Sequence, residues 1–173
     1  MSIRKRVFSS MFAAVCLAVI LPLASAAPKG PTLVDVAIAI NTEGPYAGQF
    51  DTLIAAVLAA NPAVVKTLSG NGQFTVFAPT DDAFGALGLD ENNIATVPQD
   101  ALTEILLYHV ARGRRLAEDV LDSSRIRMMD GGFVFQSGGV LTDNVGRESS
   151  IIVTDVEAAN GVIHALNGVL FPY

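Results

Sequence analysis

The 173-residue sequence predicts a single α+β domain, on three observations. Apolar residues recur at helical spacing through the first half of the chain. Short β-type runs separated by glycine-rich turns follow from about residue 125. Neither a repeat of solenoid length nor a low-complexity linker divides the chain, whose length suits about one domain of ~100–200 residues. We therefore expect the helices and a β-meander to share one core.

The chain opens with a segment typical of a secretory signal peptide. Three basic residues among the first six precede an apolar run over residues 7–23, and the tripeptide A-S-A at 24–26 provides a cleavage site. Two serines and a proline interrupt the run, which disfavours a retained membrane anchor of about 20 apolar residues. We expect residues 1–26 to be cleaved, residues 27–31 to form a short flexible leader, and residues 32–173 to form the domain.

Net charge and cysteine content exclude several classes of function. Cleavage after residue 26 leaves eight basic residues against 17 acidic ones, a net charge of −9, which does not attract nucleic acid or anionic lipid. Cys16 lies inside the predicted signal, so the mature chain has no disulfide, thiolate metal site or cysteine nucleophile. No later stretch reaches transmembrane length. We expect an exported protein, periplasmic or extracellular, without a membrane span after cleavage.

The helices are predicted from apolar spacing and capping residues. Residues 33–40 form an apolar segment, after which positions 50, 53, 54, 57 and 58 follow the spacing of one helix face. Asn61 and Pro62 end this helix and start the next, because Asn caps free N–H groups and Pro fits the first helical position. Thr80 is the expected N-cap of a short helix, and residues 98–108 form a further helix.

The strands are predicted from β-rich runs. They cover residues 74–77, 126–129, 133–135, 151–156 and 162–166. Asn160-Gly161 suits a type I′ turn, which needs two positive φ angles, and we expect it to join the last two strands into a hairpin.

Three segments have a mixed, distinctive composition: FTVFAPTDDAF at 74–84, LYHV at 107–110 and NGVIHALNGVLFP at 160–172. In sequence and order they resemble the fasciclin-like domain family, and the resemblance spans residues 32–172. Asn167 stands where the family usually has Asp, and Ala111-Arg112 stands where Val-Pro is common. The resemblance implies an α+β fasciclin-like fold, with helices packed on a β-wedge of short, mostly antiparallel strands. It also implies a secreted or surface-attached protein with a role in adhesion.

The resemblance points to Tyr108 and His109 as partner-binding residues, because the family's Tyr-His motif has been linked to partner contacts in some animal members. The residues themselves favour another interpretation, in which both rings brace the junction between a helix and the following strand. His164 shares a strand face with Val162 and Leu166, and we expect it to be a hydrogen-bonded structural residue. The adjacent carboxylates after Thr80 are explained by the helix start.

No catalytic constellation is visible in the sequence. Two histidines without H-E-x-x-H fall short of a usual catalytic zinc site, and no G-x-S-x-G elbow occurs. The glycines at 70 and 72 precede a strand, whereas those of a dinucleotide site follow one. Asp143-Asn144 lacks the spaced oxygens of a calcium loop. We expect no catalytic residues, no metal and no cofactor, and therefore a protein that is not an enzyme.

One concentrated basic patch stands out in the sequence, formed by Arg112, Arg114 and Arg115. We expect a solvated loop there, with contact to a polyanion such as an acidic surface polysaccharide as the alternative. The leading hypothesis is an interaction module that adheres to a surface or matrix protein or polysaccharide.

A second hypothesis is a soluble carrier of an apolar ligand such as a carotenoid, since some fasciclin-like proteins are associated with carotenoids. Composition does not favour it, because about 70 of the 147 residues after the signal are apolar, near the ordinary ~45–50%.

Overall fold

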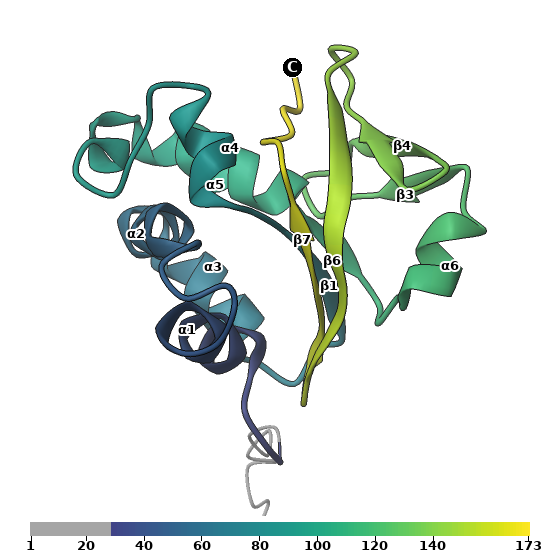
Figure 1. Ribbon diagram of the computed structural model, residues 1–173, viewed down its shortest axis with the longest axis horizontal. Coiled ribbons are helices and arrows are strands. Elements are labelled where there is room, and N and C mark those ends of the chain that lie inside the picture. Colours follow the sequence, from purple (N-terminus) through teal and green to yellow (C-terminus); the bar gives the residue numbers. More distant parts are fainter. Residues whose placement is uncertain (1–28) are drawn as a thin grey trace, which may run out of the picture.

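The computed structural model describes residues 29–173. The predicted signal peptide at 1–26 and the first two residues of the predicted leader lie outside the described residues. Figure 1 shows a layer of helices on one side of a twisted sheet, with a further small helix and the shorter strands on the other side.

Seven strands occur in the described part of the chain. They are β1 (Phe74–Pro79), β2 (Val110–Arg112), β3 (Arg125–Arg127), β4 (Phe133–Ser137), β5 (Val140–Thr142), β6 (Glu148–Ala158) and β7 (Gly161–Leu166). They form one sheet in the order β2-β1-β7-β6-β5-β4-β3, in which only β1 and β7 run parallel. The meander expected after residue 125 is confirmed, and so is the α+β fold with mostly antiparallel strands.

The two edges of this sheet approach each other. Ala111 in β2 forms an antiparallel bridge with Met128, just after β3, and Met129 N–H donates to the Val110 carbonyl at 2.8 Å. The sheet therefore wraps around on itself, which protects its edge strands from pairing with other chains.

The helices in the same part of the chain are α1 (Leu33–Thr42), α2 (Asp51–Ala59), α3 (Pro62–Leu68), α4 (Asp81–Gly85), α5 (Gln99–Tyr108) and α6 (Ala117–Leu121), with a 3₁₀ turn η1 (Ile94–Thr96). The segment at 33–40, for which the sequence indicates only apolar character, is helix α1. A capping box starts it: the Asp35 carboxylate accepts from Thr32 N–H at 2.8 Å, and Asp35 N–H donates to Thr32 Oγ1 at 3.4 Å.

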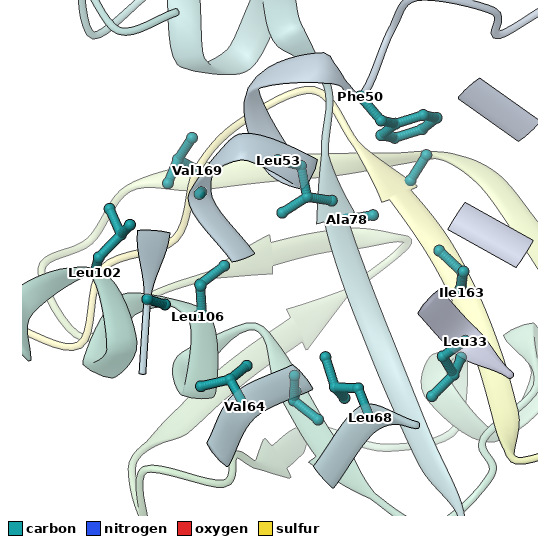
Figure 2. Close-up of a cluster of buried hydrophobic side chains, with 14 of the residues drawn as sticks. Leu33, Phe50, Leu53, Val64, Leu68, Ala78, Leu102, Leu106, Ile163 and Val169 are labelled. Atoms are coloured by element: carbon teal, nitrogen blue, oxygen red, sulfur yellow. The ribbon is translucent and has the colours of Figure 1, made fainter. Parts of the chain in front are cut away.

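Two hydrophobic cores lie on opposite faces of the sheet. Figure 2 shows the first, where Leu33, Leu53 and Val64 from the helices meet Ile163 from β7. The second core fills the inside of the wrapped sheet and includes Tyr108. Every residue of β7 is buried, because this central strand is covered on both faces.

The hairpin between β6 and β7 is confirmed, but the predicted turn type is wrong. Ala158 pairs with Gly161, so Ala159 and Asn160 are the central turn residues, and neither has the positive φ that a type I′ turn requires. Gly161 is required for a different reason. A Cβ on Gly161 would overlap the Phe74 carbonyl of β1.

The Asn160 side chain explains the turn. It is 1% exposed, and its Oδ1 accepts from Leu33 N–H at 2.8 Å. Its Nδ2 donates to the carbonyls of Leu68 at 2.6 Å and Gly70 at 2.9 Å. This one amide therefore joins the hairpin to the start of α1 and the end of α3. Asn160 is needed for these side-chain hydrogen bonds, whereas the Asn-Gly pair suggested that it is needed for a positive φ.

Within residues 29–173, no single helix has both the length and the apolar composition to cross a membrane. The pair α2 and α3 passes that test only when taken together, and it is bent by 117° at the break.

Candidate functional site

Tyr108 sits at the end of α5 with no exposed surface. Its hydroxyl donates to the Phe133 carbonyl at 2.7 Å and accepts from Asn144 N–H at 3.2 Å. Burial raises the pKa of Tyr108 to about 12, although the Asn144 hydrogen bond opposes the rise. The ring thus links the helix end to β4 and to the loop after β5.

His109 follows at the junction between α5 and β2 and is 2% exposed. Leu170 N–H donates to Nε2 at 3.0 Å, so the ring proton is on Nδ1, 2.8 Å from the Ile105 carbonyl that accepts it. Burial lowers the pKa of His109 to about 4. Both rings of the Tyr-His pair are occupied by contacts inside the domain. Their role in partner contact stays a prediction.

His164 positions a surface loop from inside the sheet. It is fully buried on β7, where Asp155 N–H donates to Nδ1 at 3.2 Å. The other ring nitrogen, Nε2, therefore carries the proton and donates to the Arg115 carbonyl at 2.9 Å. Asp155 has a positive φ of 59° within an irregular stretch of β6, and this conformation directs its N–H to the histidine.

The loop that His164 holds carries Arg114 and Arg115 of the basic patch and begins directly after Arg112, the last residue of β2. The buried hydroxyl of Thr75 on β1 fixes the same loop: it donates to the Gly113 carbonyl at 2.8 Å and accepts from Arg115 N–H at 2.9 Å. Asp155 accepts from Ala117 N–H at 2.8 Å, which anchors the start of α6. The backbone under the arginines is thus held at four points by buried or strand-borne groups.

A hollow of about 420 Å³ opens beside this loop. We call it the arginine cleft, and its lining residues are Arg112, Gly113, Arg114, Arg115, Asp119, Asp122 and Ser123. The structure therefore brings together all three predicted arginines. The residues from α6 and its end that form the rest of the lining were not anticipated, because a five-residue helix leaves little periodic signal in the sequence.

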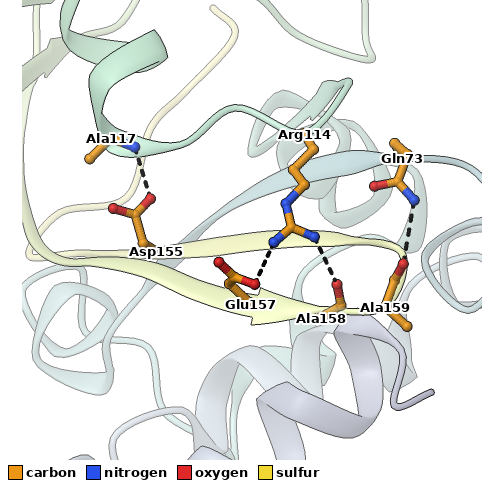
Figure 3. A network of polar contacts seen from close by, with 7 residues as sticks. All are labelled: Gln73, Arg114, Ala117, Asp155, Glu157, Ala158 and Ala159. Carbon is orange, nitrogen blue, oxygen red and sulfur yellow. Dashed lines mark hydrogen bonds and ion pairs between the residues drawn. The ribbon is translucent and has the colours of Figure 1, made fainter.

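The three arginines have different surroundings. Arg114 reaches across to β6, where it pairs with Glu157 at 2.6 Å and donates to the Ala158 carbonyl at 3.4 Å (Figure 3). The Arg112 side chain is exposed at the end of β2. Arg115 is half-buried, and its Nε is buried with no hydrogen-bond partner in the described part of the protein.

A second hollow, of about 130 Å³, lies between α1, α2, α3 and the sheet. Only apolar atoms are exposed in it, and His109 is the one polar residue of its lining. Ile38 and Leu58, which are 47% and 75% exposed, belong to the same lining. We call it the apolar pocket. It was not predicted, since a void depends on how side chains from several elements fit together.

The carboxylates of Asp81 and Asp143 accept hydrogen bonds from main-chain N–H groups. The Asp81 carboxylate accepts from Asp51 N–H at 3.2 Å and Thr52 N–H at 2.9 Å, so it caps α2 as well as standing at the start of α4. Asp143 accepts from three main-chain N–H groups, of Val145, Arg147 and Phe171.

Among residues 29–173, no group of three or more His, Cys, Asp or Glu side chains is arranged to hold a metal ion.

These features define a small α+β domain in which buried polar side chains hold loops at the surface. The model of the fasciclin domain family matches residues 48–172, and the chain belongs to this family.

Relatives and a solved structure agree with this assignment. The chain is 38% identical over 153 residues to Protein sll1483 of Synechocystis sp., covering 86% of this chain and 77% of that protein. It is 34% identical over 124 residues to transforming growth factor-beta-induced protein ig-h3 of Sus scrofa, covering 72% of this chain and 18% of that protein.

The same fold occurs in a FAS1 domain pair from the insect cell adhesion molecule fasciclin I, with a TM-score of 0.62 at 17% identity. That match covers 82% of this chain, which spans about half the length of the domain pair, 51%.

Proposed function

We propose that this protein is exported and acts as a non-enzymatic adhesion module that binds a cell surface or matrix. Membership of the fasciclin family carries the proposal, since the fold is also that of a domain pair from a cell adhesion molecule. The basic residues held on a fixed loop supply a surface for recognition. Recognition of this kind needs a rigid, partly exposed surface, and it does not need a reacting group.

Export has its own test. Mass spectrometry of the protein isolated from its native source should give a chain that begins at Ala27, and recovery of the protein should be from the periplasm or the medium. An intact N-terminus starting at Met1 would contradict export through a cleaved signal.

Adhesion is tested with a coated surface. We expect a coat of the folded protein to retain cells or envelope polymers from the native source, and a coat of the heat-unfolded protein to retain fewer. Equal retention on the two coats would remove the main support for the proposal, because the binding would then not depend on the fold.

The apolar pocket favours a second candidate function, a carrier of an apolar ligand such as a carotenoid. Its lining is apolar, and the exposed Ile38 and Leu58 offer further apolar surface for a longer ligand. The volume of about 130 Å³ lies below the ~300–1,000 Å³ typical of ligand sites, so only part of such a ligand would be enclosed.

Pigment uptake tests the carrier. A carrier should acquire a visible absorption band after incubation with β-carotene, and a Val57→Trp variant, which fills the pocket, should acquire less of it. A colourless wild-type protein after the same incubation would contradict this function and leave adhesion in place.

A further inference from the structure

Two of the three cations in the arginine cleft have no carboxylate partner within residues 29–173. Glu157 pairs with Arg114, whereas Arg112 and Arg115 form no ion pair. The Nε–H of Arg115 is also without a hydrogen-bond partner in that part of the chain, although the atom is buried. Because Nε is buried, a ligand reaches only the terminal nitrogens of this guanidinium, and two N–H bonds there suffice to bind a carboxylate in a two-pronged manner. This side of the cleft is therefore built for an anionic group.

The other side of the cleft offers hydrogen-bond acceptors. Asp119, Asp122 and Ser123 line it, and the bond from Ser123 Oγ to the Asp119 carbonyl at 2.7 Å fixes the backbone of this short segment. The Oδ2 of Asp119 accepts from Leu116 N–H at 3.1 Å, so its Oδ1 is the oxygen offered to a ligand. Carboxylate oxygens accept hydrogen bonds from hydroxyl groups but repel other anions. A ligand that satisfies both sides has a carboxylate at one end and hydroxyl groups at the other.

The distribution of charge over the protein favours a ligand of low charge density. Five of the eight basic residues beyond position 26 lie between 112 and 127, while the chain beyond that position has a net charge of −9. The bridge between Ala111 and Met128 puts Arg127 opposite Arg112 in the antiparallel register. The local positive surface attracts an anion, but the acidic remainder repels a densely charged polymer. This favours one charge per unit of ligand over a nucleic acid or a sulfated chain.

We propose that the arginine cleft binds a uronic-acid residue of an acidic polysaccharide. The carboxylate of the sugar pairs with Arg115 and Arg112, and its ring hydroxyls donate to Asp122 and Asp119. A volume of about 420 Å³ is within the ~300–1,000 Å³ range of ligand sites. This inference names the partner class of the adhesion module and therefore rests on the proposed function.

The test is a titration of the purified full chain with tetragalacturonate at low ionic strength, followed by calorimetry. We expect the dissociation constant to rise about tenfold in Arg115→Gln and in Arg112→Gln, as for the loss of a charged hydrogen-bond pair. The matched control is Lys66→Gln, which removes the same charge from an exposed position on α3, and it should change affinity less than twofold. Equal losses in all three variants would overturn the site.

Asp122→Ala separates sugar recognition from simple charge attraction. It removes an acceptor for ring hydroxyls and also a negative charge, so it weakens uronate binding if the sugar is recognised and strengthens it if only charge matters. Stronger binding in Asp122→Ala would overturn the proposal. The methyl ester of tetragalacturonate should bind at least about tenfold more weakly than the acid, and dextran sulfate no more tightly than the acid. The opposite ranking would also overturn it.

Folding and function are separated by two readouts. Thermal unfolding of each variant should match the wild type, and Arg112, whose side chain is exposed, provides the variant with least effect on folding. A wild-type protein that adheres to cells but does not bind tetragalacturonate would overturn the cleft assignment alone. One that binds tetragalacturonate but leaves cells unattached would contradict the adhesion function alone.

Discussion

Replacing Asn160 by alanine should destabilise the protein more than any exposed polar substitution. The amide makes three hydrogen bonds of 2.6–2.9 Å, to Leu33, Leu68 and Gly70. A hydrogen bond contributes about 0.5–1.5 kcal/mol net, whereas a main-chain group left buried without its partner costs about 1–3 kcal/mol. Because some of these groups are near the surface, we expect a loss on the order of 3–4 kcal/mol in the free energy of unfolding.

Urea unfolding followed by circular dichroism measures this loss. The control is Asn144→Ala, in which an exposed amide loses a single 3.2 Å bond to the Pro172 carbonyl, and we expect less than about 1 kcal/mol there. Equal losses in the two variants, or a loss below about 1 kcal/mol for Asn160→Ala, would refute the idea that this amide joins the hairpin to α1 and α3.

Asn160→Asp gives the same argument a pH dependence. The new oxygen would face the Leu68 and Gly70 carbonyls, which repel the ionised carboxylate and raise its pKa in the folded state. The folded variant then binds its proton more tightly than the unfolded one, so stability falls as pH rises above the ordinary carboxyl pKa of about 4. A variant that is more stable at pH 7 than at pH 4, relative to wild type, would contradict the observed orientation of the amide.

Three further predictions concern stability. Burial lowers the pKa of His109 from 6.5 to about 4, so the unfolded chain binds a proton on this ring at a higher pH than the folded chain does. The free energy of unfolding should therefore fall by on the order of 3 kcal/mol as pH decreases from 6.5 to 4. Urea unfolding at several pH values should show a smaller decrease in His109→Gln. Asp81→Ala should cost about 1–2 kcal/mol through the α2 cap, and Asp82→Ala less than about 0.5; equal costs would contradict the cap. Gly161→Ala should cost at least about 2 kcal/mol because its Cβ meets the β1 backbone, whereas Gly85→Ala, with open space around it, should be neutral or slightly stabilising in a thermal melt.

Helices α2 to α5 were predictable from apolar spacing and boundary residues, and α1 and α6 were not. Apolar positions at 50–58 and the Asn61-Pro62 boundary mark α2 and α3 in the sequence. The segment 33–40 is apolar on nearly every side, so its periodicity does not separate a helix from a buried strand. Its capping box, Thr32 with Asp35, carries the missing information. In α6 one start contact is local, from Leu116 N–H to the Asp119 carboxylate at 3.1 Å, but the shorter one comes from Asp155 on β6 and cannot be recognised from the local sequence.

The candidate site was predictable in part, for a similar reason. Arg112, Arg114 and Arg115 are close in the sequence, so their grouping required no knowledge of the fold. The opposite side of the cleft depends on how α6 turns back toward the loop, and that turn is fixed by contacts from β6 and β7. Asp81 shows the same limit. Its position suggested a cap for its own helix, whereas its carboxylate caps a helix that starts 30 residues earlier.

The segments that resemble the family and the residues that line the arginine cleft have separate tasks. Segments 74–84 and 160–172 contain β1 and β7, the buried centre of the sheet, and from there Thr75 and His164 fix the backbone of the arginine loop. Arg112, one of the positions at which this chain departs from the family pattern, lines the cleft. A proline there would have neither charge nor side-chain donor. The fold therefore supplies a rigid support next to the exposed Arg112, so a change of Arg112 should alter what the domain binds and leave its stability almost unchanged.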